Sequence, residues 1–203
     1  MILAVGLLVS FLGQLPIGYI NLIALKTAIN QSIKKAMLFG LGVTMVELLY
    51  LYVLMYSLHW IFENSFVYQS IQTITAIVFI ALGCRSFLKW KKNNFIQNDT
   101  SKSYHQNAFL NGVFLSSINL AQFPFWILWT SYLINIKWLP TITNQYPLFI
   151  FGTGLGTFLG ILVYIIGGKY LLQSMKKIAT NLELLIAIFF IVAAVFQIYH
   201  LIK

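Results

Sequence analysis

The sequence predicts an all-helical, polytopic membrane protein whose six transmembrane helices form two inverted three-helix repeats. Three observations favour this fold. Only 8% of the 203 residues are charged and 60% are apolar, whereas soluble domains carry about 25% charged residues. Six apolar stretches are each long enough to cross a bilayer, which takes about 20 residues. A polar stretch separates the first three from the last three, and because three is odd, the second half must enter the membrane in the opposite sense.

The predicted spans lie, in chain order, at about 2–29, 37–58, 66–88, 108–136, 147–167 and 181–201. The first and fourth are about 28 residues, or about 42 Å, long, against about 30 Å of hydrocarbon. Each has a proline near its centre, Pro16 or Pro124. Proline removes a backbone donor and clashes with the preceding helical turn. We therefore expect the first and fourth helices to be broken at these prolines.

The distribution of basic residues predicts the orientation. Ten Lys and Arg residues lie in the connections after the first, third and fifth spans, counting the flank of the third span, against two in the other connections and at the C-terminus. This distribution places those three connections in the cytoplasm and both termini outside. We expect a multi-pass protein of the bacterial inner membrane. The ten residues are Lys34, Lys35, Arg85, Lys89, Lys91, Lys92, Lys102, Lys169, Lys176 and Lys177, and the two are Lys137 and Lys203.

Residues 92–107 are the only long polar segment, and we expect a cytoplasmic connector there. It separates a first three-helix repeat at 1–91 from a second at 108–203. Small residues spaced by about one helical turn line the second span of each half and allow close helix packing. They are Ala36, Gly40 and Thr44 in the first half and Gly152, Gly156 and Gly160 in the second, with Gly42 and Gly154 beside them. The stripe of the fifth span fits packing within one chain or between copies in a homodimer, and the sequence leaves both open.

Glu47 lies about ten residues, or about 15 Å, inside the second span. A charge at the centre of a span costs about 2.5–3.5 kcal/mol on insertion scales, so we expect Glu47 to face the protein interior. The matching position in the fifth span is Leu159 or Ile161. Glu47 is either a carboxyl that carries a coupling proton or contacts a substrate ammonium group, or a neutral, hydrogen-bonded packing group. Lys26 either snorkels to the cytoplasmic interface or pairs with Glu47 or with a substrate carboxylate.

Amide side chains flank both prolines, and each proline is preceded by glutamine at the same spacing. At a helix break such amides bond freed backbone groups, or they contact substrate, because the N-terminus of a broken helix presents N–H groups and a positive dipole end to a carboxylate. Gly18 would allow close approach of backbone or ligand. Trp126 either walls the cavity or packs in the core or against lipid. The candidate substrate or coupling residues are Gln14, Pro16, Gly18, Asn21, Glu47, Asn119, Gln122, Pro124 and Trp126.

The sequence shows no arrangement of residues for enzyme chemistry. His59, His105 and His200 lie at span ends, and the four carboxylates have no metal-ligand spacing. A phosphate-binding loop is also missing. We therefore expect no enzyme activity, no cofactor, no bound metal and no ATP-driven pumping by this chain. The net charge of +9 follows the membrane orientation, so we expect no nucleic-acid partner.

Two short motifs resemble the LysE-type translocators, a bacterial family of small amino-acid exporters. Leu15-Pro16-Ile17-Gly18 lies where the family has a Pro-Gly-Pro-like break in the first span. Phe109-Leu110-Asn111-Gly112, followed by Asn119, fits the Phe-x-x-Gly and Asn-Pro segments of the fourth span. The chain departs from the pattern because the second proline of the first motif is missing, Leu120 replaces the other family proline, and Pro124 comes four residues later.

The resemblance implies two inverted three-helix repeats that export amino acids or similar small zwitterionic metabolites by alternating access around a midplane site, with the proton gradient as energy source. Two other interpretations stay open. A redox or metal-handling membrane protein with the same repeats would require paired cysteines or clustered His and Asp residues within its spans. The chain has one cysteine, Cys84. A non-transporting membrane scaffold would leave the broken helices and Glu47 without a purpose.

Overall fold

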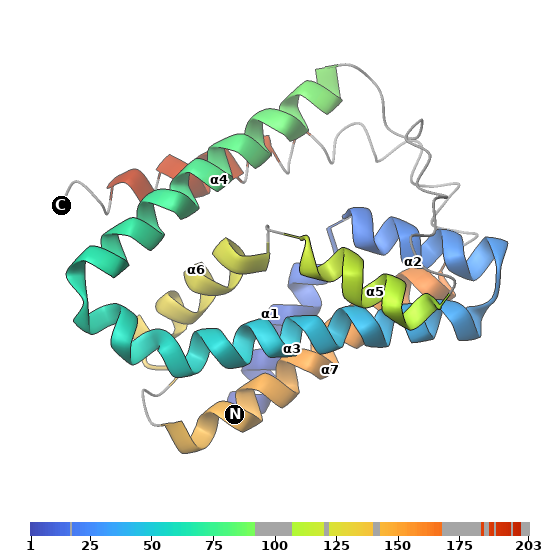
Figure 1. The fold of residues 1–203 in the computed structure, drawn as a ribbon, viewed down its shortest axis with the longest axis horizontal. Coiled ribbons are helices and arrows are strands. Elements are labelled where there is room, and N and C mark those ends of the chain that lie inside the picture. Colours follow the sequence, from blue (N-terminus) through green and yellow to red (C-terminus); the bar gives the residue numbers. More distant parts are fainter. Residues whose placement is uncertain are drawn as a thin grey trace. The chain divides into compact units, whose positions relative to one another are not determined.

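The computed structural model describes residues 1–16, 18–91, 107–119, 122–139 and 143–167, together with 184, 187–188, 190–195 and 197–199. Every regular element in these ranges is a helix (Figure 1). Three helices are long and apolar enough to cross a membrane, and one bent helix pair brings the number to four. The all-helical membrane class is therefore confirmed, while the described residues hold fewer clear spans than the six predicted.

Three predicted spans appear as continuous helices. They are α3 (Ile33–Glu63), α4 (Ser65–Lys91) and α7 (Tyr146–Ile166, preceded by the short 3-10 helix η1, Thr143–Gln145). The helix α3 is longer than the predicted span 37–58 at both ends, because the sequence has no proline between Ile33 and Glu63 to stop it.

The first span is broken where the sequence predicts. The helix α1 (Ile2–Gln14) ends before Pro16, and α2 (Tyr19–Asn30) begins after it, with a bend of 78° between them. Pro16 cannot donate a backbone hydrogen bond, so the helix cannot continue through it without loss. The bend changes the direction of the chain within the predicted span and exposes the last carbonyl groups of α1 and the first N–H groups of α2.

The fourth span is also interrupted, but not at Pro124 as predicted. The helix α5 (Ala108–Ser117) ends first, and α6 (Gln122–Asn135) begins at Gln122. Pro124 is the third residue of α6, where backbone N–H groups have no partner inside the helix, so a proline is tolerated there. The break follows Ser117 instead, and Asn119 is within it. The two Gln-x-Pro triplets are therefore not equivalent, because Gln14 ends a helix and Gln122 begins one.

The described residues group into two compact units. The first comprises Met1–Met55 and Asp99–Met175, and the second Tyr56–Asn98 and Lys176–Lys203. Each unit thus draws on both halves of the sequence. In the second unit Phe79 of α4 packs on Phe190, with ring centroids 5.6 Å apart.

Two predictions fall largely on residues that the structure does not describe. These are the connector at 92–107, of which residue 107 alone is described, and the sixth span at 181–201. Within that span the structure describes an apolar helical segment, Phe190–Tyr199.

In the first unit, α1 packs closely on α7 through glycines (Figure 1). A Cβ atom added at Gly6 would come within 3.0 Å of the Phe149 carbonyl oxygen. One added at Gly152 would come equally close to the carbonyl of Leu3. The two helices run parallel, because the contacting residues increase together along both. Any side chain at these glycines would force the backbones apart.

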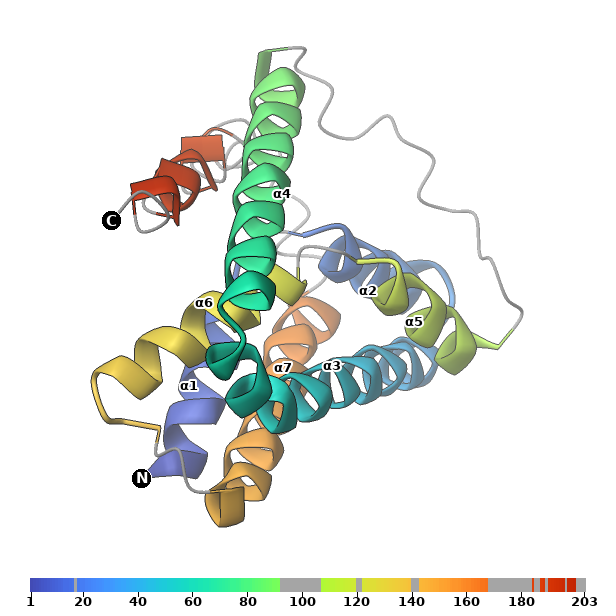
Figure 2. The same cartoon turned by 60° about the vertical axis from the view of Figure 1, so that its left-hand side comes forward.

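The helices α3 and α5 pack through the same kind of contact and lie side by side in both ribbon views (Figure 2). A Cβ atom at Gly112 would overlap the carbonyl of Phe39, and one at Gly42 would overlap the carbonyl of Phe109. Gly42, and not Gly40, therefore makes the contact that matches the one at Gly152. Both close helix pairs join a helix from 1–91 to one from 108–203.

Candidate functional site

The site is built around Glu47, which lies near the middle of the apolar stretch Ile33–Ser57 and is 3% exposed. The indole Nε1 of Trp126, on α6, donates to Glu47 Oε1 at 2.9 Å. The Nε2 of Gln14, at the end of α1, donates to Oε2 at 3.3 Å. Three helices of the first unit, α1, α3 and α6, thus meet at one carboxyl, which faces the protein interior as predicted.

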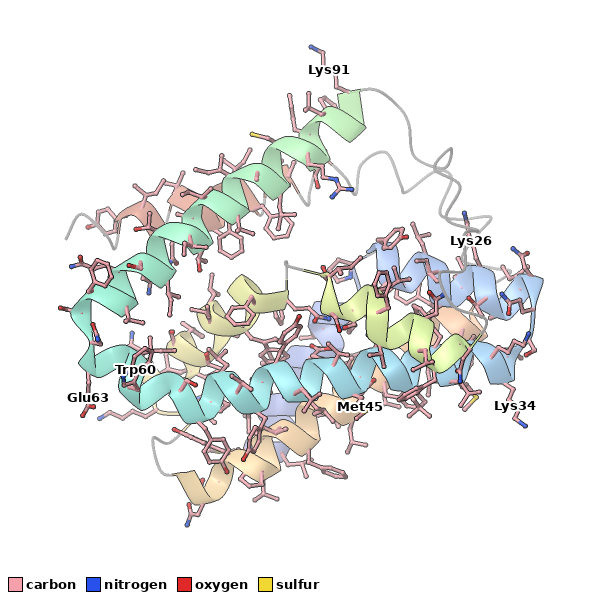
Figure 3. The ribbon with its side chains drawn as sticks, in the orientation of Figure 1. Lys26, Lys34, Met45, Trp60, Glu63 and Lys91 are labelled. Atoms are coloured by element: carbon pink, nitrogen blue, oxygen red, sulfur yellow. The ribbon has the colours of Figure 1, made fainter. Side chains whose placement is uncertain are left out.

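Lys26 lies on α2, and its side chain points away from α3 in Figure 3. The described hydrogen bonds of Glu47 go instead to neutral side chains from α1 and α6. This placement fits the alternative in which the Lys26 ammonium group reaches the membrane interface.

At the first helix break, side chains bond the carbonyls that α1 leaves without helical partners. Asn21 is 3% exposed, and its Nδ2 donates to the carbonyl oxygens of Gln14 at 2.7 Å and Pro16 at 3.2 Å. The hydroxyl of Tyr164, on α7, donates to the carbonyl of Leu15. Asn21 therefore fulfils the backbone-bonding role, which was one of the two alternatives for the amides.

The second break is bonded in a similar way. Gln122 and Ser116 are both buried, and the Gln122 Nε2 donates to Ser116 Oγ at 3.2 Å. The backbone N–H of Asn119 donates to the Ser116 carbonyl, and its own carbonyl accepts from the N–H of Gln122. The Tyr50 hydroxyl, on α3, donates to the carbonyl of Ser117 at 2.7 Å. At each break, then, a tyrosine on a neighbouring long helix bonds a carbonyl that the broken helix leaves free.

Not all predicted residues come together at Glu47. Gln14 and Trp126 do, and the described contacts of Trp126, which is 1% exposed, are in the core. Pro16 and Asn21 are at the first break, and Asn119 and Gln122 at the second. Gly18 does not serve close approach in this structure, because a Cβ there would have no atom within 4 Å and its φ of −91° suits any residue. Its role toward a ligand stays a prediction.

The sequence analysis missed four hydroxyl-bearing residues. Ser10 and Thr157 are buried and their hydroxyl oxygens lie 2.6 Å apart, which joins α1 to α7. Tyr50 and Tyr164 bond the backbone at the breaks. The available signal was the position of Thr157 between Gly156 and Gly160, on a helix face that the glycines already marked for close packing. Isolated Ser, Thr and Tyr residues in apolar spans are too common to single out by type.

A comparison with protein-family models gives a match to the LysE type translocator over residues 11–201. The chain belongs to this family. It is accordingly a membrane transporter of the efflux type, and transporters rather than enzymes make up the family. Searches of curated proteins and of solved structures gave no match.

In this LysE-type translocator the motifs that carried the resemblance lie at structural breaks and contacts. Leu15 to Gly18 join α1 to α2, and Asn119 falls in the break between α5 and α6. Phe109 and Gly112 make the close contact with α3. The helix is interrupted at Asn119 although the next residue in the sequence is Leu120 and not proline. A proline at position 120 is therefore not required for the interruption in this translocator.

Proposed function

We propose that this LysE-type translocator exports amino acids or similar small zwitterionic metabolites across the bacterial inner membrane, driven by the proton gradient. The observation that carries the proposal is the buried carboxyl of Glu47 at mid-span, bonded from α1 and α6. A buried ionisable group within a span marks a substrate or proton pathway by default. Glu47 would carry the coupling proton or bind the substrate ammonium group.

The first helix break supplies a second element of the proposed site. Gly18 is the N-cap of α2 and provides no side-chain cap. The positive end of a helix dipole attracts anions, and broken helices in transporters use it to hold substrate carboxylates. Gln14 ends α1 at this break and reaches Glu47. A zwitterion would therefore have its carboxylate near the start of α2 and its ammonium group toward Glu47.

The proposal includes two inverted three-helix repeats, at 1–91 and 108–203, with alternating access between them. The glycine contacts support it. Leu3-x-x-Gly6 on α1 and Phe109-x-x-Gly112 on α5 make equivalent contacts, and so do Phe39-x-x-Gly42 on α3 and Phe149-x-x-Gly152 on α7. Reciprocal packing of the first span of each half on the second span of the other is what a two-fold axis in the membrane plane produces.

The contacts also give a register for the proposed repeats. Gly6 and Gly112 differ by 106 in residue number, and Gly42 and Gly152 differ by 110. The first offset pairs Ser10 with Ser116, both buried. The second pairs Glu47 with Thr157, in place of the Leu159 or Ile161 expected from the sequence.

The test uses purified protein in liposomes loaded with a mixture of amino acids, with and without an imposed proton gradient. We expect amino acids to leave when the gradient is present. Glu47→Gln should abolish gradient-driven efflux while the protein still folds, because glutamine keeps the shape but cannot ionise. Glu63→Gln, at the end of α3, is the matched control and should transport normally (Figure 3).

Three outcomes would contradict parts of the proposal. Normal efflux by Glu47→Gln removes Glu47 from the mechanism. Efflux that ignores the proton gradient removes proton coupling. If every amino acid stays inside the liposomes under all gradients, the result would favour a non-transporting scaffold or a metal or redox role. Measuring metal uptake by the same liposomes then distinguishes these two alternatives.

A further inference from the structure

Asn21 lies at the third position of α2 and is 3% exposed, although its side chain is a polar amide within a predicted membrane span. Its Nδ2 donates to the carbonyl oxygens of Gln14 and Pro16 across the first helix break. Its other polar atom, Oδ1, is buried and has no hydrogen-bond partner among the described residues. Buried polar atoms are nearly always paired in native proteins, and an unpaired one costs free energy. The bonding of the break uses only the NH₂ group of Asn21 and leaves this oxygen unexplained.

The orientation of the Asn21 amide is fixed by the same two bonds. Both partners of its NH₂ group are carbonyl oxygens, at 2.7 and 3.2 Å, and a carbonyl oxygen can only accept. Turning the amide over would place Oδ1 against two oxygens and lose both bonds. The unpaired atom is therefore the acceptor, and a ligand that satisfies it must bring a donor group or a cation.

The surroundings of this acceptor combine free donors with a buried carboxyl. The helix α2 begins after Gly18, which provides no side-chain cap, so the N–H groups of its first turn have no partner within the helix. On the other side of the break, Gln14 joins Asn21 to Glu47. The Gln14 carbonyl accepts from Asn21, and its Nε2 donates to Glu47 Oε2 at 3.3 Å. Asn21 is thus one residue removed from the carboxyl at the centre of the site.

The two ends of a zwitterion match these groups differently. A carboxylate can only accept hydrogen bonds, so it suits the first-turn N–H groups of α2 and is repelled by Asn21 Oδ1. An ammonium group can only donate, so it suits an unpaired oxygen and a carboxylate. The unpaired oxygen therefore belongs to the ammonium end of the ligand.

We propose that Asn21 Oδ1 accepts an N–H bond from the substrate ammonium group and that Asn21 is a specificity-determining residue. A carboxylate such as that of Glu47 attracts any cation, whereas a neutral amide oxygen gains most from a cation that donates a hydrogen bond. The protein should therefore select amino acids over betaines, which carry the same two charges but no N–H bond. The inference rests on the proposed function in taking a zwitterion as the substrate.

The test measures binding to the purified protein in detergent and needs no proton gradient. The standard amino acids other than proline are compared by the rise in unfolding temperature that each produces. Dissociation constants are then measured for the amino acid with the largest rise and for its N-methyl, N,N-dimethyl and N,N,N-trimethyl derivatives. The positive charge stays the same along this series while the N–H bonds fall from three to none. We expect the last methyl group to weaken binding about tenfold or more, because it removes the last N–H bond.

Variants then assign the effect to Asn21. Asn21→Leu removes the acceptor, and we expect it to bind the dimethyl and trimethyl derivatives with nearly equal affinity. It also loses the bonds across the break, so Tyr164→Phe, which loses the bond to the Leu15 carbonyl, is the control for a weakened break. Asn111→Leu is the matched control for position, because Asn111 on α5 is also buried and also has an unpaired Oδ1. Both controls should keep the ratio of affinities of the parent protein.

Several outcomes would overturn the inference. One is a parent protein that binds the trimethyl derivative as tightly as the dimethyl one. Another is a ratio that persists in Asn21→Leu, or one that is lost equally in Tyr164→Phe or Asn111→Leu. Binding that requires Na⁺ and shows no preference for N–H bonds would mean that the oxygen holds a metal ion instead. If Asn21→Leu does not fold, Asn21→Ala replaces it, with the same expected loss of the ratio.

Failure of the inference can be told apart from failure of the proposed function. Efflux that ignores the proton gradient contradicts the proposed coupling, while a preference for N–H bonds in binding still upholds the role of Asn21. Proton-driven efflux of amino acids and betaines alike supports the coupling and overturns the role of Asn21. Binding of none of the amino acids contradicts both.

Discussion

The hydroxyl of Tyr164 donates to the carbonyl of Leu15, so α7 bonds a backbone group that the end of α1 leaves without a helical partner. Tyr164→Phe removes that bond and little else. We expect the free energy of unfolding to fall by about 1–3 kcal/mol, the cost of leaving a buried polar group unpaired. Thermal unfolding of the purified protein in detergent measures the change. Tyr132→Phe, at a half-exposed position on α6, is the control, and equal losses in both variants would contradict a special role for Tyr164.

Trp126→Phe keeps an aromatic ring in the core but removes the N–H group that donates to Glu47. One carboxyl oxygen then loses a donor, and we expect lower stability by about 1–3 kcal/mol together with reduced gradient-driven efflux. Trp129→Phe, one turn along α6, serves as the control, since Trp129 packs edge-on against Tyr132. If both variants behave alike, the ring and not the N–H group accounts for the effect.

The glycines at the close helix contacts should not tolerate alanine. In Gly112→Ala and Gly42→Ala the new methyl group would overlap a backbone carbonyl of the facing helix, which cannot move aside. Overpacking of this kind costs about 1–3 kcal/mol. Gly18→Ala introduces the same methyl group into open space and should unfold at the parent temperature. A tolerated alanine at 42 or 112 would contradict the packing described for α3 and α5.

The orientation can be tested with single cysteines. After Cys84→Ser removes the one native cysteine, Lys34→Cys should react only with reagents that reach the cytoplasm. Asn144→Cys should react with an impermeant reagent added to whole cells. Both positions are exposed, so labelling depends on the side of the membrane. Reversed labelling would place the termini in the cytoplasm.

The sequence predicted the class and the interior-facing carboxyl for simple physical reasons. A stretch of apolar residues has to be a helix in a bilayer, and Glu47 has to point away from lipid. The break at Pro16 followed equally from the missing N–H group. These features depend on local composition and on the solvent, so no knowledge of distant contacts was needed.

The sequence could not show which residues meet. The break in the fourth span lies before Pro124 and not at it. A proline is tolerated in the first turn of a helix as well as between helices, so its position did not show which of the two applied. Glu47 gains its partners from residues 33 and 79 positions away along the chain. The close contact of α3 with α5 is made by Gly42, whereas the sequence pattern fits Gly40 equally well.

The pairing of α1 with α7 has a consequence for biosynthesis. The two helices contact each other through Gly6 and Gly152. The α1 segment therefore cannot form its native contact in the membrane until most of the chain has been synthesised. During that interval its glycine face has no native neighbour, and contacts so distant in sequence form slowly. A fragment that stops before α7 should therefore be a substrate for membrane proteases, however well its own helices insert.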